Sequence, residues 1–119
     1  MNSNLNNIEK SLITEIIKEH IIKFPFLNNH YKELYVRNRE NTGVGFYINF
    51  LYKNEMESTD LNTTISTKKS LLIKGFKNEV NYELDITSGK INFLEIVSNG
   101  ADIFDKNIDE YIFELKELR

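Results

Sequence analysis

The chain is predicted to be a single α+β domain over residues 1–119, with one or two N-terminal helices packed on an antiparallel sheet of about five or six strands. Three observations lead to this fold class. Apolar residues recur at helical spacing near the N-terminus, they alternate at period two in several later segments, and glycine-containing turns separate those segments. Consecutive antiparallel strands with short turns leave one sheet face for helices to cover.

The first element is expected to be an amphipathic helix. Its apolar positions recur every three or four residues, at Ile8, Leu12, Ile16, Ile17, Ile21 and Phe24. Asn6 or Asn7 is a suitable N-cap, because a short polar side chain there accepts a hydrogen bond from a free backbone N–H. Pro25 disfavours helical geometry at Phe24, so the helix should end there. A second short helix should then run from Pro25 to about Lys32.

The strongest strand signal is a glycine-hinged hairpin. Residues 34–40 are predicted as its first strand and residues 43–51 as its second. One face of the second strand carries, at period two, Val44, Phe46, Ile48 and Phe50. Gly43 and Gly45 permit a left-handed turn or a bulge, which residues with a Cβ resist.

The later residues predict further strands around one long loop. Residues 53–69 are polar, with Leu61 and Ile65 as apolar anchors, and form the longest and most mobile expected loop. Strands are predicted at 70–74, 80–86, 91–97 and 111–116, with a hairpin turn at 87–90. The first helix should cover the sheet face built from Val44, Phe46, Ile48, Tyr82, Leu84 and Ile86. A barrel-like sheet curled around that helix is also compatible with the pattern.

Composition and charge restrict the class of protein. The net charge is −3, and no cysteine is present, which excludes disulfides and thiolate metal sites. The polar N-terminus does not resemble a secretory signal, and no apolar run is long enough to span a bilayer, so a cytoplasmic protein is expected. A richness in Asn, Ile and Lys favours an AT-rich bacterial source. Residues 61–79 carry four Lys and one Glu, whereas residues 101–117 carry two Lys and six acidic residues.

The sequence offers no convincing catalytic constellation. The two histidines, His20 and His30, lack the spacing of a helix-presented metal pair. A ribonuclease-like site would use His30 or Glu40 as the base, with Arg37 and Arg39 as phosphate clamps. In a regular strand Arg37 and Arg39 share one face and Glu40 points to the other, so base and clamps diverge unless a bulge re-aims them. We therefore expect no enzyme, no cofactor and no metal site.

Two features of the predicted sheet leave alternatives open. Glu95 either faces solvent or is a carboxylate set among apolar neighbours, where burial would raise its pKa and mark a pocket. Tyr35, Tyr47 and Tyr52 either line an apolar cleft or serve as core and rim residues. The face around Tyr47 and Asn49 is the surface that a small-molecule-binding or self-associating module would use.

The first hairpin resembles a known motif. Residues 39–50, Arg-Glu-Asn-Thr-Gly-Val-Gly-Phe-Tyr-Ile-Asn-Phe, are similar to the R-E-x-T-G-V-G-F-F-T-x-F hairpin of a group of small bacterial proteins of unknown function. The proline-led turn at Pro25 and a late segment extend the resemblance over about residues 25–115; that segment is matched here by Gly89, Ile91, Leu94 and Glu95. This chain has Tyr47 and Ile48 where the group prefers Phe and Thr, and it lacks the aromatic and proline residues that follow the late segment. The resemblance implies the α+β fold, and it transfers no catalytic residues. An immunity-like role is suggested instead by analogy with small acidic proteins that act as toxin antidotes.

Acidic segments that contain aromatic residues give the best functional indication. Such a surface suits docking onto a basic protein, because charge steers the approach and aromatic side chains hold the complex. The predicted partner-binding residues are Asp102, Asp105, Asp109, Glu110 and Tyr111, with Glu55, Glu57 and Asp60 as a second patch. We expect an immunity-type antidote that occludes a basic toxin domain, with neither nucleic acid nor membrane as a partner. A ribonuclease-like enzyme and a ligand-binding or self-associating module are the alternatives.

Overall fold

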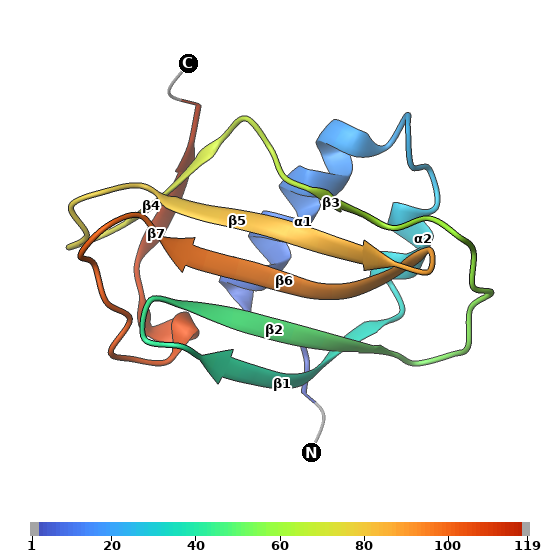
Figure 1. Ribbon diagram of the computed structural model, residues 1–119, viewed down its shortest axis with the longest axis horizontal. Coiled ribbons are helices and arrows are strands. Elements are labelled where there is room, and N and C mark those ends of the chain that lie inside the picture. Colours follow the sequence, from blue (N-terminus) through green and yellow to red (C-terminus); the bar gives the residue numbers. More distant parts are fainter. Residues whose placement is uncertain (1–2, 118–119) are drawn as a thin grey trace.

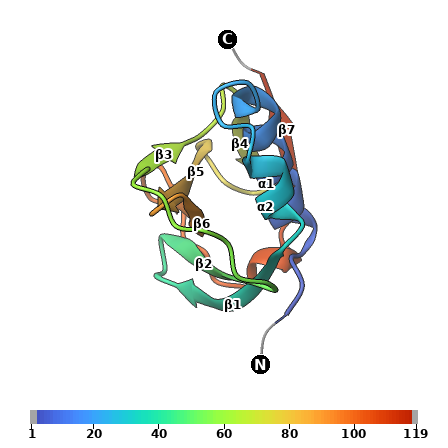
Figure 2. The ribbon, with the colours of Figure 1, turned by 90° about the vertical axis from the view of Figure 1, so that its right-hand side faces the viewer.

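The computed structural model describes residues 3–117, whose strands form one antiparallel sheet curved around two helices (Figure 1, Figure 2). The helical elements are α1 (Asn7–His20), α2 (Leu27–Tyr31) and the 3₁₀ turn η1 (Ile108–Glu110). The strands are β1 (Leu34–Asn41), β2 (Gly45–Tyr52), β3 (Thr63–Ile65), β4 (Ser70–Ile73), β5 (Val80–Thr87), β6 (Lys90–Ser98) and β7 (Phe113–Lys116). The predicted α+β class is therefore confirmed.

The strands follow the order β1-β2-β6-β5-β4-β7, and β3 pairs with β5 beside β4. Seven strands are present among the described residues, compared with the five or six predicted. The additional strand is β3, which lies inside the polar segment 53–69 that we expected to be one irregular loop. Three residues are too short for an alternation pattern to be recognised, although the predicted anchor Ile65 is buried there.

The start of α1 matches the prediction, but its end does not. Asn6 is the N-cap: its side chain accepts a hydrogen bond from the backbone N–H of Glu9, and the Glu9 carboxylate accepts one from the Asn6 N–H. The helix ends at His20 rather than at Phe24, and a turn follows. Ile22 is 96% exposed, so continuing the helix would bury little further apolar surface.

The core lies between the inner sheet face and the helices, as Figure 2 shows. The predicted inner positions on β2 and β5 are buried: Phe46, Ile48, Tyr82, Leu84 and Ile86. Val44 was predicted to join them, and this is wrong, because it lies in the turn before β2 and is 48% exposed. The sheet also curls around the helices, so the barrel-like description is close to the observed shape.

Two glycines of the first hairpin are required for different reasons. Gly43 has φ +89°, a left-handed conformation that a residue with a Cβ rarely adopts. Gly45 is needed for space, because an added Cβ would lie 2.1 Å from the carbonyl oxygen of Ile96 on β6. The glycine at this position therefore allows β2 and β6 to pair.

A bulge in β1 changes which side chains face the helices. The β1–β2 register shifts between Val36 and Asn38, so Arg37 has no cross-strand partner. Beyond the bulge Arg39 pairs with the inward-facing Ile48, and Arg39 therefore points to the helix side of the sheet, while Arg37 is exposed. The prediction that Arg37 and Arg39 share one face is wrong for this reason.

Candidate functional site

The outer sheet face carries a line of polar side chains across four strands. Glu40 on β1 lies opposite Tyr47 on β2, Tyr47 lies opposite Glu95 on β6, and Glu95 lies opposite Glu83 on β5. We call these four residues the acidic row. They face outward because the residues before and after them in β2, β5 and β6 fill the core.

Aromatic surface lies at the centre of this face. The rings of Tyr47 and Phe93 meet edge to face, with centroids 5.4 Å apart. Phe93 in turn lies opposite a further carboxylate, Asp85, on β5. Beside the row, Asn49 donates hydrogen bonds to Asn38 Oδ1 at 2.7 Å and to Glu40 Oε2 at 3.1 Å, which orders the β1 side of the face.

The acidic row concentrates negative charge. The hydrogen bond between Tyr47 and the Glu95 carboxylate raises the pKa of Tyr47, and the negative charges of Glu95 and Glu40 raise it further. Glu83 and Glu95 are direct cross-strand neighbours of like charge, an arrangement that destabilises a sheet. Neither the Arg39–Glu9 ion pair nor the Lys69–Glu15 ion pair involves the row.

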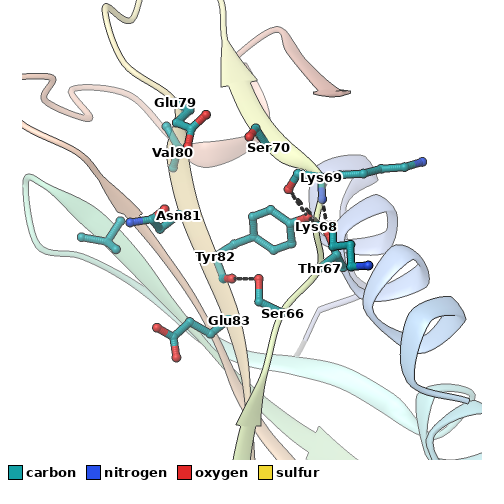
Figure 3. Close-up of a pocket in the computed structure, with 11 residues that line it drawn as sticks. Ser66, Thr67, Lys68, Lys69, Ser70, Glu79, Val80, Asn81, Tyr82 and Glu83 are labelled. Atoms are coloured by element: carbon teal, nitrogen blue, oxygen red, sulfur yellow. Dashed lines mark hydrogen bonds between the residues drawn. The ribbon is translucent and has the colours of Figure 1, made fainter. Parts of the chain in front are cut away.

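At its β5 end the row reaches a hollow in the sheet (Figure 3). β3 pairs with β5 up to Ile65 opposite Leu84, and β4 pairs with β5 only at Leu71 opposite Val80, so residues 66–69 depart from the sheet between these points. The hollow has a volume of about 330 Å³, and its lining includes Ser66, Ser70, Glu79, Asn81 and Glu83.

A hydrogen-bond network fixes the departing segment. Ser66 Oγ donates to the Tyr82 carbonyl at 2.5 Å, and the Tyr82 hydroxyl donates to the Lys69 carbonyl at 2.9 Å and also contacts Thr67 Oγ1 (Figure 3). Burial raises the pKa of the Tyr82 hydroxyl. Because the backbone that borders the hollow is tied down in this way, the hollow is a built part of the fold.

Lys69 and the backbone of Lys68 contact α1. Lys69 extends away from the hollow (Figure 3), and its Nζ lies 3.2 Å from Glu15 Oε2. The backbone N–H of Lys68 donates to Glu19 Oε2 at 3.0 Å. The positive charge that the sequence concentrates in residues 61–79 is therefore partly neutralised by the helix.

Some of the acidic residues predicted to bind a partner near the C-terminus already form hydrogen bonds within the chain. The Asp102 carboxylate accepts hydrogen bonds from the backbone N–H groups of Lys77 and Asn78, at 3.0 and 3.1 Å. Asp105 receives a hydrogen bond from the Tyr111 hydroxyl through its Oδ1, at 3.1 Å, and its own backbone N–H donates to that hydroxyl at 2.7 Å. The Asp102 contacts attach residues 99–112 to the turn between β4 and β5, and the Asp105–Tyr111 contacts join positions within this segment.

Tyr111 is an aromatic packing residue of the same segment. Its ring meets Phe76 and Phe104 edge to face, with centroids 5.7 and 5.4 Å away. Asp109 and Glu110 are exposed on η1. Asp102 and Asp105 use their carboxylates in hydrogen bonds within the chain. Asp109 and Glu110 are therefore the predicted C-terminal acidic residues whose carboxylates are available to a partner.

The second predicted patch lies elsewhere on the molecule. Glu55, Glu57 and Asp60 are exposed on the segment that leaves the end of β2. Figure 1 shows this segment at one end of the sheet and residues 99–112 at the other end. The two patches therefore form separate surfaces, and the acidic row lies between them.

The residues of the ribonuclease-like alternative do not converge. His30 is 8% exposed, and its Nδ1 lies 2.8 Å from the Tyr52 hydroxyl, which accepts a hydrogen bond from the backbone N–H of Ile91 at 2.7 Å. Burial lowers the pKa of His30, and the positive charge of Lys90 lowers it further. Burial also raises the pKa of Tyr52 to about 12. The His30–Tyr52 pair thus lies within the fold on the helix side.

The predicted phosphate clamps are also directed elsewhere. Arg39 Nε and Nη2 donate to the two carboxylate oxygens of Glu9, at 2.6 and 2.9 Å. This hydrogen bonding raises the pKa of Arg39. Glu40 stands on the outer face. His20 Nε2 lies 2.7 Å from the Ser66 carbonyl. Within residues 3–117, no three His, Asp or Glu side chains are placed to hold a metal ion.

The structure also resolves the alternatives for Glu95 and the tyrosines. Glu95 is half-buried on the outer face beside Tyr47, in contact with solvent. Tyr52 lies opposite the buried Leu34 and points inward, whereas Tyr47 points outward, so these tyrosines do not line one cleft. The alternation of Glu and Tyr with apolar residues indicated their outward direction, but the sequence did not reveal that they align across strands.

Comparisons of the chain with protein-family models, with curated proteins and with solved structures find no match in any of the three. In the part of the chain that the structure describes, no helix has the length and apolar content needed to cross a bilayer.

Proposed function

We propose that this chain is a non-catalytic protein-binding module that docks its outer sheet face onto a basic protein. In its most concrete form the proposal is an immunity-type antidote that occludes a bacterial toxin domain. The observation that carries it is the acidic row, in which three carboxylates and one tyrosine align across four strands next to Phe93. The like-charged pair Glu83–Glu95 costs stability in the free protein, and cations of a partner would relieve that cost.

The chemistry of the face indicates how it would recognise a partner. Tyr47 has Glu40 on one side and Glu95 on the other, so a lysine or arginine placed over its ring gains a cation–π contact and two nearby carboxylates. Tyrosine is also among the residues most often found at energetic hot spots of interfaces. The hollow beside Glu83 provides room for a second partner side chain.

The exposed acidic residues at the two ends of the molecule fit the same proposal. Glu55, Glu57 and Asp60 at one end, and Asp109 and Glu110 at the other, extend the negative surface beyond the row. Charges at the rim mainly accelerate association, whereas groups at the centre hold the complex. Nucleic acid is disfavoured as a partner, because its phosphates would be repelled by the same carboxylates.

Occlusion would follow from the rigidity of the face. The row is carried by strands paired on both sides in β2, β5 and β6, so little ordering is required on binding. The antidote would act stoichiometrically, covering the basic active surface of the toxin without chemical change to either protein.

The test combines capture with a functional readout. Tagged wild-type protein and the Glu83→Lys/Glu95→Lys variant are used to capture partners from lysate of the source organism, and each captured domain is then co-expressed with both proteins. We expect one basic domain that is toxic alone, neutralised by the wild type and not by the variant. The matched control is Glu19→Lys/Glu117→Lys, which makes the same charge change at two exposed residues outside the row and outside both predicted patches, and should still neutralise. A neutralised domain that the row variant binds equally well would contradict the proposed face.

A further inference from the structure

The sheet ends in a strand with an open edge. β7 is the last strand of the order and pairs only with β4 in the part of the chain that the structure describes, and Figure 2 shows it at the margin of the sheet. The opposite edge, β1, is partly covered, because the backbone groups of Ser3 and Val36 exchange hydrogen bonds of 3.0 and 2.6 Å. An open edge presents unpaired N–H and C=O groups to any further strand.

The hydrogen-bond alternation identifies which groups are available. The backbone N–H of Lys74 donates to the Ile112 carbonyl at 2.9 Å. In an antiparallel pair, successive residues direct their backbone groups to opposite sides. Glu114 and Lys116 therefore direct theirs toward β4, and Phe113 and Leu115 direct theirs toward the open edge.

The side chains of β7 also divide into two sets. Phe113 lies opposite the buried Ile73 and Leu115 opposite the buried Leu71, so both face the core side, where they remain partly exposed. Glu114 and Lys116 are exposed on the outer face. Two opposite charges thus stand two residues apart along the open edge.

We propose that β7 pairs antiparallel with β7 of a second copy of this chain, with Leu115 opposite Leu115 at the two-fold axis. In this register Glu114 of each copy lies opposite Lys116 of the other, which gives two ion pairs by symmetry. Placing Phe113 opposite Leu115 instead sets Glu114 against Glu114, and placing Phe113 opposite Phe113 sets Glu114 against Ile112. Only the first register pairs both charges with opposite charges.

The proposed contact also brings together the apolar side chains of the two β7 strands. On the core side the two copies of Leu115 lie opposite each other, and Phe113 of each copy lies diagonal to Leu115 of the other, so the contact covers part of the apolar surface that the single chain leaves exposed. A lysine on an edge strand usually keeps other chains away, because its charge would lie unpaired in a new sheet. Here Lys116 meets Glu114, so the charge favours self-pairing in one register.

Sedimentation over a concentration series from micromolar to millimolar tests the proposal. The wild type should move from the 14.0 kDa mass of the chain toward twice that mass. Glu114→Lys alone and Lys116→Glu alone place like charges opposite each other, so each should dimerise at least about tenfold more weakly. The matched control Glu110→Lys carries the same charge change outside β7 and should dimerise like the wild type.

Mixing the two single variants gives the sharpest outcome. In a 1:1 mixture each copy of one variant offers two lysines to the two glutamates of the other, so dimers should return. The charge-swapped Glu114→Lys/Lys116→Glu chain should also dimerise, and circular dichroism verifies the fold of every variant. A wild type that stays monomeric, or single variants that dimerise as well as the wild type, would overturn the proposal. Because the acidic row is intact in all of these variants, the result is independent of the proposed partner binding.

Discussion

Replacing Arg39 with alanine should be among the most destabilising single changes in this chain, because it leaves the buried carboxylate of Glu9 without its ion-pair partner. Glu9 is fully buried, with 0% exposure, and its two oxygens accept from Arg39 Nε at 2.6 Å and Nη2 at 2.9 Å. Without the guanidinium, the carboxylate retains one backbone partner, the Asn6 N–H at 2.9 Å. Arg39 further donates to Ser3 Oγ and to the Asn4 carbonyl, so the N-terminal segment loses its attachment as well.

The magnitude follows from the burial of the pair. Removing one partner of a buried ion pair costs about 3–5 kcal/mol of unfolding free energy. The Arg39 side chain is 29% exposed, so water can reach the space it leaves, and a loss near the lower end, about 3 kcal/mol, is expected. With a urea dependence of about 1.5 kcal/mol per molar, the unfolding midpoint should fall by about 2 M.

Urea unfolding of matched variants isolates the cause. Arg37→Ala removes the same side chain two residues earlier, at the exposed bulge, and should cost less than about 0.5 kcal/mol. Adding Glu9→Gln to Arg39→Ala should restore part of the stability, since no buried charge then remains and glutamine preserves the capping box. Equal losses for Arg39→Ala and Arg37→Ala, or a double variant less stable than Arg39→Ala, would refute the reasoning.

Three further outcomes test the fold and its pH dependence. Gly45→Ala should destabilise by about 3 kcal/mol or prevent folding, because its Cβ would meet the Ile96 carbonyl at 2.1 Å; thermal unfolding near the wild-type midpoint would contradict this. Tyr52→Phe should cost about 1–2 kcal/mol in urea unfolding, because the Ile91 N–H and His30 lose the hydroxyl that they contact. The pKa of His30 is lowered on folding, chiefly by burial and then by the charge of Lys90, so folding favours the neutral ring. The stability that neutral His30 contributes is therefore complete above the unfolded pKa of about 6.5. It is lost as pH falls from that value toward the lowered pKa of the folded protein. His30→Gln should therefore flatten the fall in stability between pH 7 and 5 relative to wild type, whereas an unchanged slope would show that another group causes it.

The sequence was sufficient for six of the seven strands, for the start of α1 and for most of the inner sheet face, because burial leaves a local pattern. The alternation over 80–86 placed Tyr82, Leu84 and Ile86 in the core, where they lie. The Asn6 cap was likewise predictable, since its partner Glu9 is only three residues away. Val44 was misplaced because the same alternation continues into a turn, where no facing layer covers it.

The acidic row could not be predicted, because it depends on the register between strands that are distant in the chain. β2 pairs with β6 rather than only with its neighbour β1, and this pairing brings Tyr47 to Glu95. The bulge at Arg37 reverses the direction of Arg39 and assigns Glu40 to the row. Neither event leaves a signal in a single sequence.

Glu9 and the C-terminal acidic residues show the limit of reading charge from composition. Glu9 is a carboxylate in the first turn of α1, and its burial becomes favourable only through Arg39, thirty positions later. Asp102 and Asp105 were interpreted as partner-binding, yet both already form hydrogen bonds within the chain, chiefly with backbone N–H groups and the Tyr111 hydroxyl. Local charge therefore predicts where carboxylates are, but not which of them remain available.

The most direct test of the proposed docking face is calorimetric titration of the captured basic domain into wild type, the Glu83→Lys/Glu95→Lys variant and the Glu19→Lys/Glu117→Lys control. A stoichiometry of one with the wild type, an affinity at least about a hundredfold weaker for the row variant and a near-wild-type affinity for the control would support docking through the acidic row. Equal affinities for the wild type and the row variant, with both correctly folded by circular dichroism, would contradict it.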